Sequence, residues 1–127
     1  MLDRLTVESF HHDLLRQHGG RSGLRDSQAL EAVLSRPKLH GQYQPEEGVH
    51  VLAASLCHAL ASNHPFIDGN KRVAFVAMAV FLELNGWELI ASEVDVVDMM
   101  LSLASGDTHE AELAVWLASR TERFDVG

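Results

Sequence analysis

The chain has 127 residues, 46% of them hydrophobic, and a formal net charge of −8, with ten Lys and Arg against 18 Asp and Glu. This length and composition correspond to one globular domain and exclude intrinsic disorder as the main state. So acidic a protein does not bind nucleic acid directly over a broad face, because such binding needs a basic surface opposite several phosphates.

The remaining bulk features favour a soluble protein of the cytoplasm. Cys57 is the single cysteine, which excludes an internal disulfide and is typical of a reducing compartment. The first residues lack the apolar stretch of a signal peptide. The longest apolar run, residues 73–82, has ten residues, and a membrane-spanning helix needs about 20. We therefore expect no membrane partner.

Two helices are predicted in the first third of the chain. Thr6 is a candidate N-cap for a helix that ends at the glycine pair 19–20. Asp26 is a candidate N-cap for a second helix through Leu34. This helix has to end near residue 36, because Pro37 disfavours helical backbone in the residue before it.

A flap and a third helix follow. Residues 37–45 contain Gly41 and two prolines without a helical period, which predicts a loop or a short hairpin. The next helix is predicted to begin near Pro45, since Glu46 and Glu47 suit the positive end of its dipole. Its apolar stripe repeats at helical spacing and consists of Val49, Leu52, Ala53, Leu56, Cys57 and Leu60.

The fourth helix is expected to be the central core element. Residues 63–69 interrupt the helical pattern, and residues 70–84 then read as a helix that is apolar on nearly every side. It is predicted to end at the Asn-Gly pair 85–86 as a left-handed C-cap. Residues 87–91 read as a short, extended segment.

Two more helices complete the chain, ending near Ala104 and Arg123. The candidate N-caps are Ser92 for the fifth helix and Asp107 or Thr108 for the sixth, with Asp107 and Glu110 at the spacing of a capping box. Six helices with short connections predict an all-α fold, and we expect a single domain over residues 1–127.

One pair of charges does not suit the helix that carries it. Lys71 and Arg72 stand at the start of the fourth helix, where the dipole is already positive, and each such cation costs about 0.3–1 kcal/mol when exposed. A bound anion would reverse the sign, because backbone N–H groups, dipole and both side chains would point at it. The alternative is that the two side chains reach into solvent or pair with carboxylates.

The preceding loop adds the groups that phosphoryl transfer requires. His64 takes a proton near neutral pH, and Pro65 is expected to hold it in an extended conformation. Phe66 can anchor the loop in the core, and Gly69 allows close approach of backbone to a phosphate. Asp68 beside an anion site favours a cation between them, and Mg²⁺ is commonly held by one or two carboxylates with substrate phosphates.

Residues 64–72 (HPFIDGNKR) resemble the signature of the Fic/Doc (Fido) superfamily, most closely the death-on-curing (Doc) branch. The segments 19–31 and 81–86 are similar to that branch as well, so the resemblance spans nearly the whole chain. It implies a Fido-type helical domain that uses ATP or another nucleoside triphosphate together with Mg²⁺.

The resemblance also implies roles for single residues. His64 would deprotonate the acceptor hydroxyl, Asp68 would hold Mg²⁺ against the phosphates, and Phe66 would secure the loop. The flap would align the target segment as an added strand. The residues expected to bind phosphate are Gly69, Asn70, Lys71 and Arg72, of which Lys71 and Arg72 also assist catalysis.

Two positions separate the branches of the family. Fic proteins that transfer AMP have Gly at the position of Lys71 and a second Arg at that of Phe75. Their absence favours the Doc pattern, which implies phosphorylation of translation elongation factor Tu and a block of translation, with AMP transfer as the alternative. No Ser/Thr-x-x-x-Glu-Gly/Asn inhibitory signature occurs. Restraint would then come from a separate, Phd-like antitoxin.

Two other classes of function stay open. One is a Fido module that binds a nucleotide or an antitoxin without turnover, although His64 is superfluous for binding alone. The other is a metal protein using His58, His64 and Asp68, although helical spacing gives it little support. The other six histidines are most simply surface residues, and Cys57, on an apolar stripe, is expected to be a buried thiol rather than a nucleophile.

Overall fold

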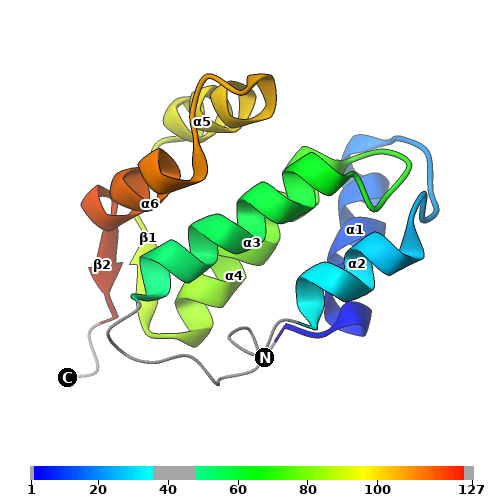
Figure 1. Ribbon diagram of the computed structural model, residues 1–127, viewed down its shortest axis with the longest axis horizontal. Coiled ribbons are helices and arrows are strands. Elements are labelled where there is room, and N and C mark those ends of the chain that lie inside the picture. The colour runs from blue at the N-terminus through cyan, green and yellow to red at the C-terminus, as the bar shows by residue number, and fades with distance from the viewer. Residues whose placement is uncertain (1, 36–47, 125–127) are drawn as a thin grey trace.

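The computed structural model describes residues 2–35 and 48–124, and over these ranges the chain is mostly helical (Figure 1). The predicted all-α class is confirmed. The flap predicted at residues 37–45 lies outside the described ranges. The elements in them are α1 (Arg4–His18), α2 (Ser27–Leu34), α3 (Val49–Asn63), α4 (Asn70–Leu84), β1 (Trp87–Leu89), α5 (Glu93–Ser105), α6 (Glu110–Ser119) and β2 (Thr121–Arg123).

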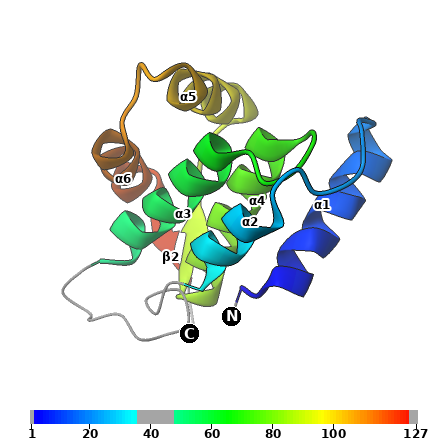
Figure 2. The ribbon, with the colours of Figure 1, turned by 45° about the vertical axis from the view of Figure 1, so that its right-hand side comes forward.

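Helices α3 and α4 form the centre of the molecule. They lie side by side, with α1 and α2 at one flank and α5 and α6 at the other (Figures 1 and 2). The predicted α3 stripe is buried from Leu52 to Leu60, and α4 buries Val73, Met78 and Leu82. Both helices also carry several buried alanines, whose small side chains let helices pack closely. The core role expected of α4 is therefore confirmed and is shared with α3.

Two predicted N-caps are wrong. Asp3 caps α1, because its carboxylate accepts the backbone N–H of Thr6 at 2.8 Å. At α6 the N-cap is His109, whose backbone N–H donates to the carboxylate of Glu112 at 3.0 Å. Asp107 instead accepts the hydroxyl of Ser105 in the turn between α5 and α6. In each case the observed cap is the residue with extended backbone before the first helical turn, Asp3 (φ −107°, ψ 176°) or His109 (φ −93°, ψ 166°).

The C-terminal part of the predicted sixth helix is a strand. Helix α6 ends at Ser119, and residues 121–123 form β2, antiparallel to β1 with Trp87 opposite Arg123. The extended segment expected after α4 supplies the partner strand and begins directly after Gly86, whose φ is 88°. Asn85 is not left-handed, with φ −106°. Pairing with β1 satisfies backbone groups that one more helical turn would have bonded internally.

The segment between α3 and α4 lies at one end of the central helix pair, beside the connection from α1 to α2 (Figures 1 and 2). Leu24 forms an isolated antiparallel bridge with Phe66, so the two segments are joined through their backbones. This end of the molecule carries the predicted site. Within the described ranges, no helix is both long and apolar enough to cross a bilayer.

Candidate active site

The candidate site is built on residues 64–69, which connect α3 to α4. The loop begins and ends with left-handed backbone, at His64 (φ 47°, ψ 57°) and at Gly69 (φ 77°, ψ 18°). Glycine adopts this conformation at no steric cost. His64 is the only non-glycine residue with positive φ in the described part of the chain, and such a conformation costs roughly 1–3 kcal/mol.

The prediction that Pro65 holds His64 extended is therefore wrong, and Arg25 supplies the reason. The Arg25 guanidinium donates to the carbonyl oxygens of His64 at 2.7 Å and Asn63 at 2.8 Å, the last carbonyls of α3. A cation at this end of a helix also complements its dipole. The end of α3 thus turns sharply into the loop because Arg25 satisfies the carbonyl groups that the helix leaves free.

Backbone hydrogen bonds extend this contact along the loop. The N–H groups of Arg25 and Asp26 both donate to the Pro65 carbonyl, at 2.8 and 3.0 Å. In the other direction, the N–H of Ile67 donates to the carbonyl of Gly23 at 3.0 Å. The loop consequently rests on a second stretch of backbone instead of projecting alone into solvent.

Asn70 and Phe66 brace the inside of the loop. Phe66 is 2% exposed, as its predicted anchoring role requires. The Asn70 amide accepts the N–H of Phe66 at 3.0 Å and donates to its carbonyl at 2.9 Å. The side chain of Asn70 thereby bridges the loop, and only its backbone N–H is left at the start of α4 for an anion.

His11 is a residue of this site that the sequence analysis placed on the surface, and that expectation is wrong. It is 5% exposed, and its ring stacks on Phe66 with 3.9 Å between centroids and 15° between planes. Its Nε2 lies 2.7 Å from the carbonyl oxygen of Asp68, so Nε2 carries the proton and donates. Helical spacing contained a signal, since Val7, His11 and Leu14 lie on one face of α1.

The positive end of α4 opens into a cavity of about 700 Å³. The first N–H of the helix to donate to a backbone carbonyl is that of Val73, to Gly69 at 3.1 Å, which leaves the N–H groups of residues 70–72 directed out of the helix end. All six predicted site residues line this one cavity: His64, Asp68, Gly69, Asn70, Lys71 and Arg72. It therefore combines an exposed imidazole, a carboxylate and a helix end whose free N–H groups suit an anion.

Lys71 and Arg72 are both exposed, and in the described ranges neither has a carboxylate within ion-pair distance. Pairing with carboxylates does not explain these charges within that part of the chain. Beyond them lies a second, mostly apolar hollow of about 450 Å³ between α1, α4 and α5, which contains the partly buried Phe75. The two cations thus separate a polar cavity from an apolar groove.

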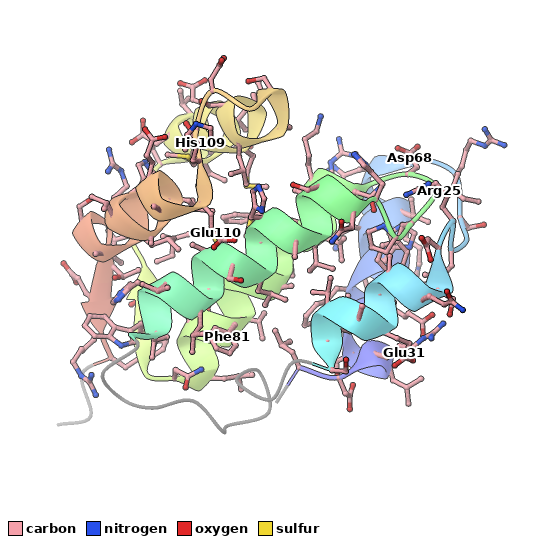
Figure 3. The ribbon with its side chains drawn as sticks, in the orientation of Figure 1. Arg25, Glu31, Asp68, Phe81, His109 and Glu110 are labelled. Atoms are coloured by element: carbon pink, nitrogen blue, oxygen red, sulfur yellow. The ribbon has the colours of Figure 1, made fainter. Side chains whose placement is uncertain are left out.

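The carboxylate of Asp68 is ionised at neutral pH. Backbone N–H groups of Arg21 (3.3 Å) and Gly69 (2.9 Å) donate to it and lower its pKa, and the charges of Arg72 and Arg21 add to this effect. It lies exposed at the same end of the molecule as Arg25 (Figure 3). A single ionised carboxylate beside an anion site fits Mg²⁺ that is shared with nucleotide phosphates, and Asp68 would hold it.

The alternative metal site does not form. Among the described residues, no group of three His, Cys, Asp or Glu side chains is arranged to hold a metal ion. His58 pairs instead with Glu110 of α6 (Nδ1–Oε1, 3.6 Å), and Figure 3 shows Glu110 well separated from Asp68. Cys57 is fully buried as expected, and burial raises the pKa of its thiol to about 12, so it is no nucleophile.

Comparison with known proteins finds related sequences over most of the chain. Residues 1–82 match the sequence profile of the Fic/DOC family. The chain is 36% identical over 113 residues to Toxin Doc of Mycolicibacterium smegmatis (strain ATCC 700084 / mc(2)155), a match covering 86% of each chain. It is 26% identical over 106 residues to Protein kinase doc of Escherichia phage P1, covering 84% of this chain and 83% of the phage protein.

Proposed function

Because the chain belongs to the Fic/DOC family, we propose that it is a Doc-like toxin that transfers phosphate from ATP to a hydroxyl of a target protein. One observation carries the proposal: the imidazole of His64, the carboxylate of Asp68 and the positive end of α4 face one cavity. The names of the two relatives, a toxin and a protein kinase, support the same reading.

The residues of the cavity divide the chemistry between them. His64 accepts the proton of the target hydroxyl, whose oxygen then forms a bond to the γ-phosphorus as the bond to the β-phosphate oxygen breaks. ADP leaves, and the imidazolium returns its proton to solvent. Lys71, Arg72 and the N–H groups at the start of α4 stabilise negative charge on the phosphates. When bound at Asp68, Mg²⁺ would neutralise further phosphate charge.

Two residues, Phe75 and Lys71, favour phosphate transfer over AMP transfer. The position that carries a second arginine in AMP-transferring relatives is Phe75, whose side chain lines the apolar groove. Lys71 supplies one further cation at the cavity itself. AMP transfer would use the same His64 but break the bond between the α- and β-phosphates, and it stays the alternative.

Labelled ATP distinguishes the candidate functions. Purified protein is incubated with a cell extract and with ATP labelled at either the γ- or the α-phosphate. Transfer of the γ-label to a protein supports the kinase, and transfer of the α-label supports the adenylyltransferase. If the folded protein binds ATP but transfers neither label, the module without turnover is the better description.

For the target we propose elongation factor Tu, on the family resemblance alone. Phosphorylation would arrest translation and growth. In a purified translation system the protein should stop peptide synthesis, and mass spectrometry should find one added phosphate on the factor. An unmodified factor in an arrested system would exclude this target while leaving the transfer reaction standing.

For restraint we propose a Phd-like antitoxin whose segment covers the apolar groove next to Lys71 and Arg72. Val97 and Leu101 of α5 are 49% and 53% exposed there, so an unpartnered apolar face adjoins two cations. An amphipathic helix with an acidic side chain complements both features. The antitoxin would first be identified as the protein that restores growth when it is expressed with wild type. Leu101→Asp should still arrest growth in the presence of this antitoxin. Full neutralisation of this variant would exclude the groove.

A further inference from the structure

Two side chains from the N-terminal part of the chain donate hydrogen bonds to the active-site loop, residues 64–69, at separate places. Arg25, in the connection before α2, contacts the half that carries His64. His11, on α1, contacts the half that carries Asp68 and Gly69. The two contacts use different elements and different chemistry, so they can be altered one at a time.

The Arg25 contact determines the conformation of the base. His64 is the C-cap of α3 in a left-handed conformation that a histidine before proline rarely adopts. Such a conformation persists only where its surroundings hold it, and here two guanidinium hydrogen bonds hold the carbonyls of residues 63 and 64. Without them, His64 would relax toward extended backbone, and its imidazole would leave the position that it has in the cavity.

The His11 contact determines where the anion-binding half lies. The ring is buried against Phe66, and Nε2 holds the Asp68 carbonyl at 2.7 Å. A Cβ built on Gly69 would lie 3.6 Å from Nε2, so the ring also lies directly against the backbone of the left-handed turn. Backbone hydrogen bonds also hold this turn, from the Arg21 N–H to the Asp68 carboxylate and from the Ile67 N–H to the Gly23 carbonyl. The His11 ring is the side chain that fixes the Asp68 carbonyl itself, and with it the Asp68–Gly69 peptide.

We propose that Arg25 and His11 are positioning residues with separate tasks: Arg25 places His64 for proton transfer, and His11 places the Asp68–Gly69 turn for nucleotide and Mg²⁺. The division into turnover and binding rests on the proposed function. The division into two halves of the loop rests on the contacts alone. Neither residue is required to touch the substrate.

The Arg25 half is tested with Arg25→Gln and Arg25→Lys, with Arg4→Gln as the control. Arg4 lies in α1 and donates to Glu31 of α2 at 2.7 Å, away from the loop. Arg25→Gln should lower kcat by about 10–100-fold, because a base displaced by about 1 Å loses as much, with KM for Mg-ATP unchanged. Arg25→Lys, which retains a cation but has a single donor nitrogen in place of the two that contact the carbonyls, should lie between. Arg4→Gln should change neither parameter.

The His11 half is tested with a pair of variants that separate the ring from the hydrogen bond. His11→Phe keeps an aromatic ring on Phe66 but leaves the Asp68 carbonyl without its donor, and it should raise the Kd for Mg-ATP about tenfold. Its kcat at saturating nucleotide should stay within about twofold of wild type. His11→Gln, which can still donate, should bind more tightly than His11→Phe.

Backbone chemical shifts of isotope-labelled protein provide a readout that does not need activity. Arg25→Gln should move the signals of His64 toward extended values and leave Gly69 unchanged, and His11→Phe should do the opposite. If either variant disturbs both residues equally, or if Arg4→Gln lowers kcat as much as Arg25→Gln, the division of tasks is wrong. If wild type neither binds Mg-ATP nor transfers phosphate, the proposed function is wrong. The chemical shifts of His64 and Gly69 would then still test whether Arg25 and His11 position the two halves of the loop.

Discussion

Replacing Arg72 by Gln tests whether the cations in the first turn of α4 are under electrostatic strain in the ligand-free protein. Arg72 is exposed in the first turn of α4, where a cation costs about 0.3–1 kcal/mol. Electrostatic attraction between Arg72 and the negative charge of Asp68 offsets part of this cost. The ligand-free variant should therefore be between equally stable and about 1 kcal/mol more stable, a rise in Tm of at most about 4 °C for a domain of this size.

With ligand bound, the order of stabilities should reverse, because Mg-ATP should stabilise wild type more than Arg72→Gln. At 100 times its Kd, a ligand stabilises the folded protein by about 2.7 kcal/mol. Loss of a charged hydrogen-bonding partner costs about 2 kcal/mol, or roughly a thirtyfold rise in Kd, so the gain of the variant at the same concentration should fall below about 1 kcal/mol. Gln cannot replace the two parallel donors of a guanidinium on phosphate.

The assay is thermal unfolding of both proteins with and without Mg-ATP. Arg16→Gln is a matched control with the opposite sign, because Arg16 is exposed in the last turn of α1, where a cation suits the dipole. It should lower Tm slightly and keep the full gain from ligand. A clear loss of stability in ligand-free Arg72→Gln would show a structural ion pair instead. Equal gains from ligand in wild type and Arg72→Gln would place the phosphate elsewhere.

Four further predictions concern single side chains. His64→Ala should keep fold and nucleotide binding but lower transfer by roughly 10²–10⁴; a folded variant with unchanged transfer would remove His64 from the mechanism. Expression of wild type without a partner should arrest growth and Asp68→Ala should relieve the arrest, whereas harmless expression of folded wild type would contradict a toxin. Asp68→Asn should melt below wild type at pH 7, because a lowered pKa stabilises the fold while the group is ionised; the difference should vanish as the pH falls below the usual carboxyl range. Cys57, with its pKa raised to about 12 by burial, should react with a thiol reagent at pH 8 only after unfolding, as absorbance of the released thiolate would report.

Helix boundaries were predictable where a cap lies close in sequence to the groups it satisfies. Asp26 accepts the N–H of Ala29 and Ser92 that of Asp95, each three residues ahead, and α2 and α5 begin where these caps predict. The caps predicted for α1 and α6 were wrong by only one to three residues, because several residues near each helix start can accept or donate a capping hydrogen bond. Asp3 also lies three residues before the N–H group that it accepts, that of Thr6, so the helix begins earlier than a cap at Thr6 predicts.

The features that sequence reasoning missed depend on distant residues. The conformation of His64 follows from Arg25 rather than from the adjacent proline. His11 is buried because Phe66 and the Asp68 carbonyl come to lie against α1. Strand β2 exists because β1 offers a partner. The six residues predicted for the site nevertheless line one cavity, since a compact motif keeps them together on one turn and one helix end.

The partners of the active-site loop lie far away along the chain: His11 bonds to a residue 57 positions later, and Arg25 to one 39 positions later. Contacts of such sequence separation form only after the intervening chain has been made and has folded back. During synthesis, α1 and α2 leave the ribosome well before the loop that they shape. We therefore expect nascent chains that stop before α4 to be inactive. If the target is part of the translation machinery, as proposed, the ribosome making this protein is not exposed to an active toxin until α4 has been synthesised.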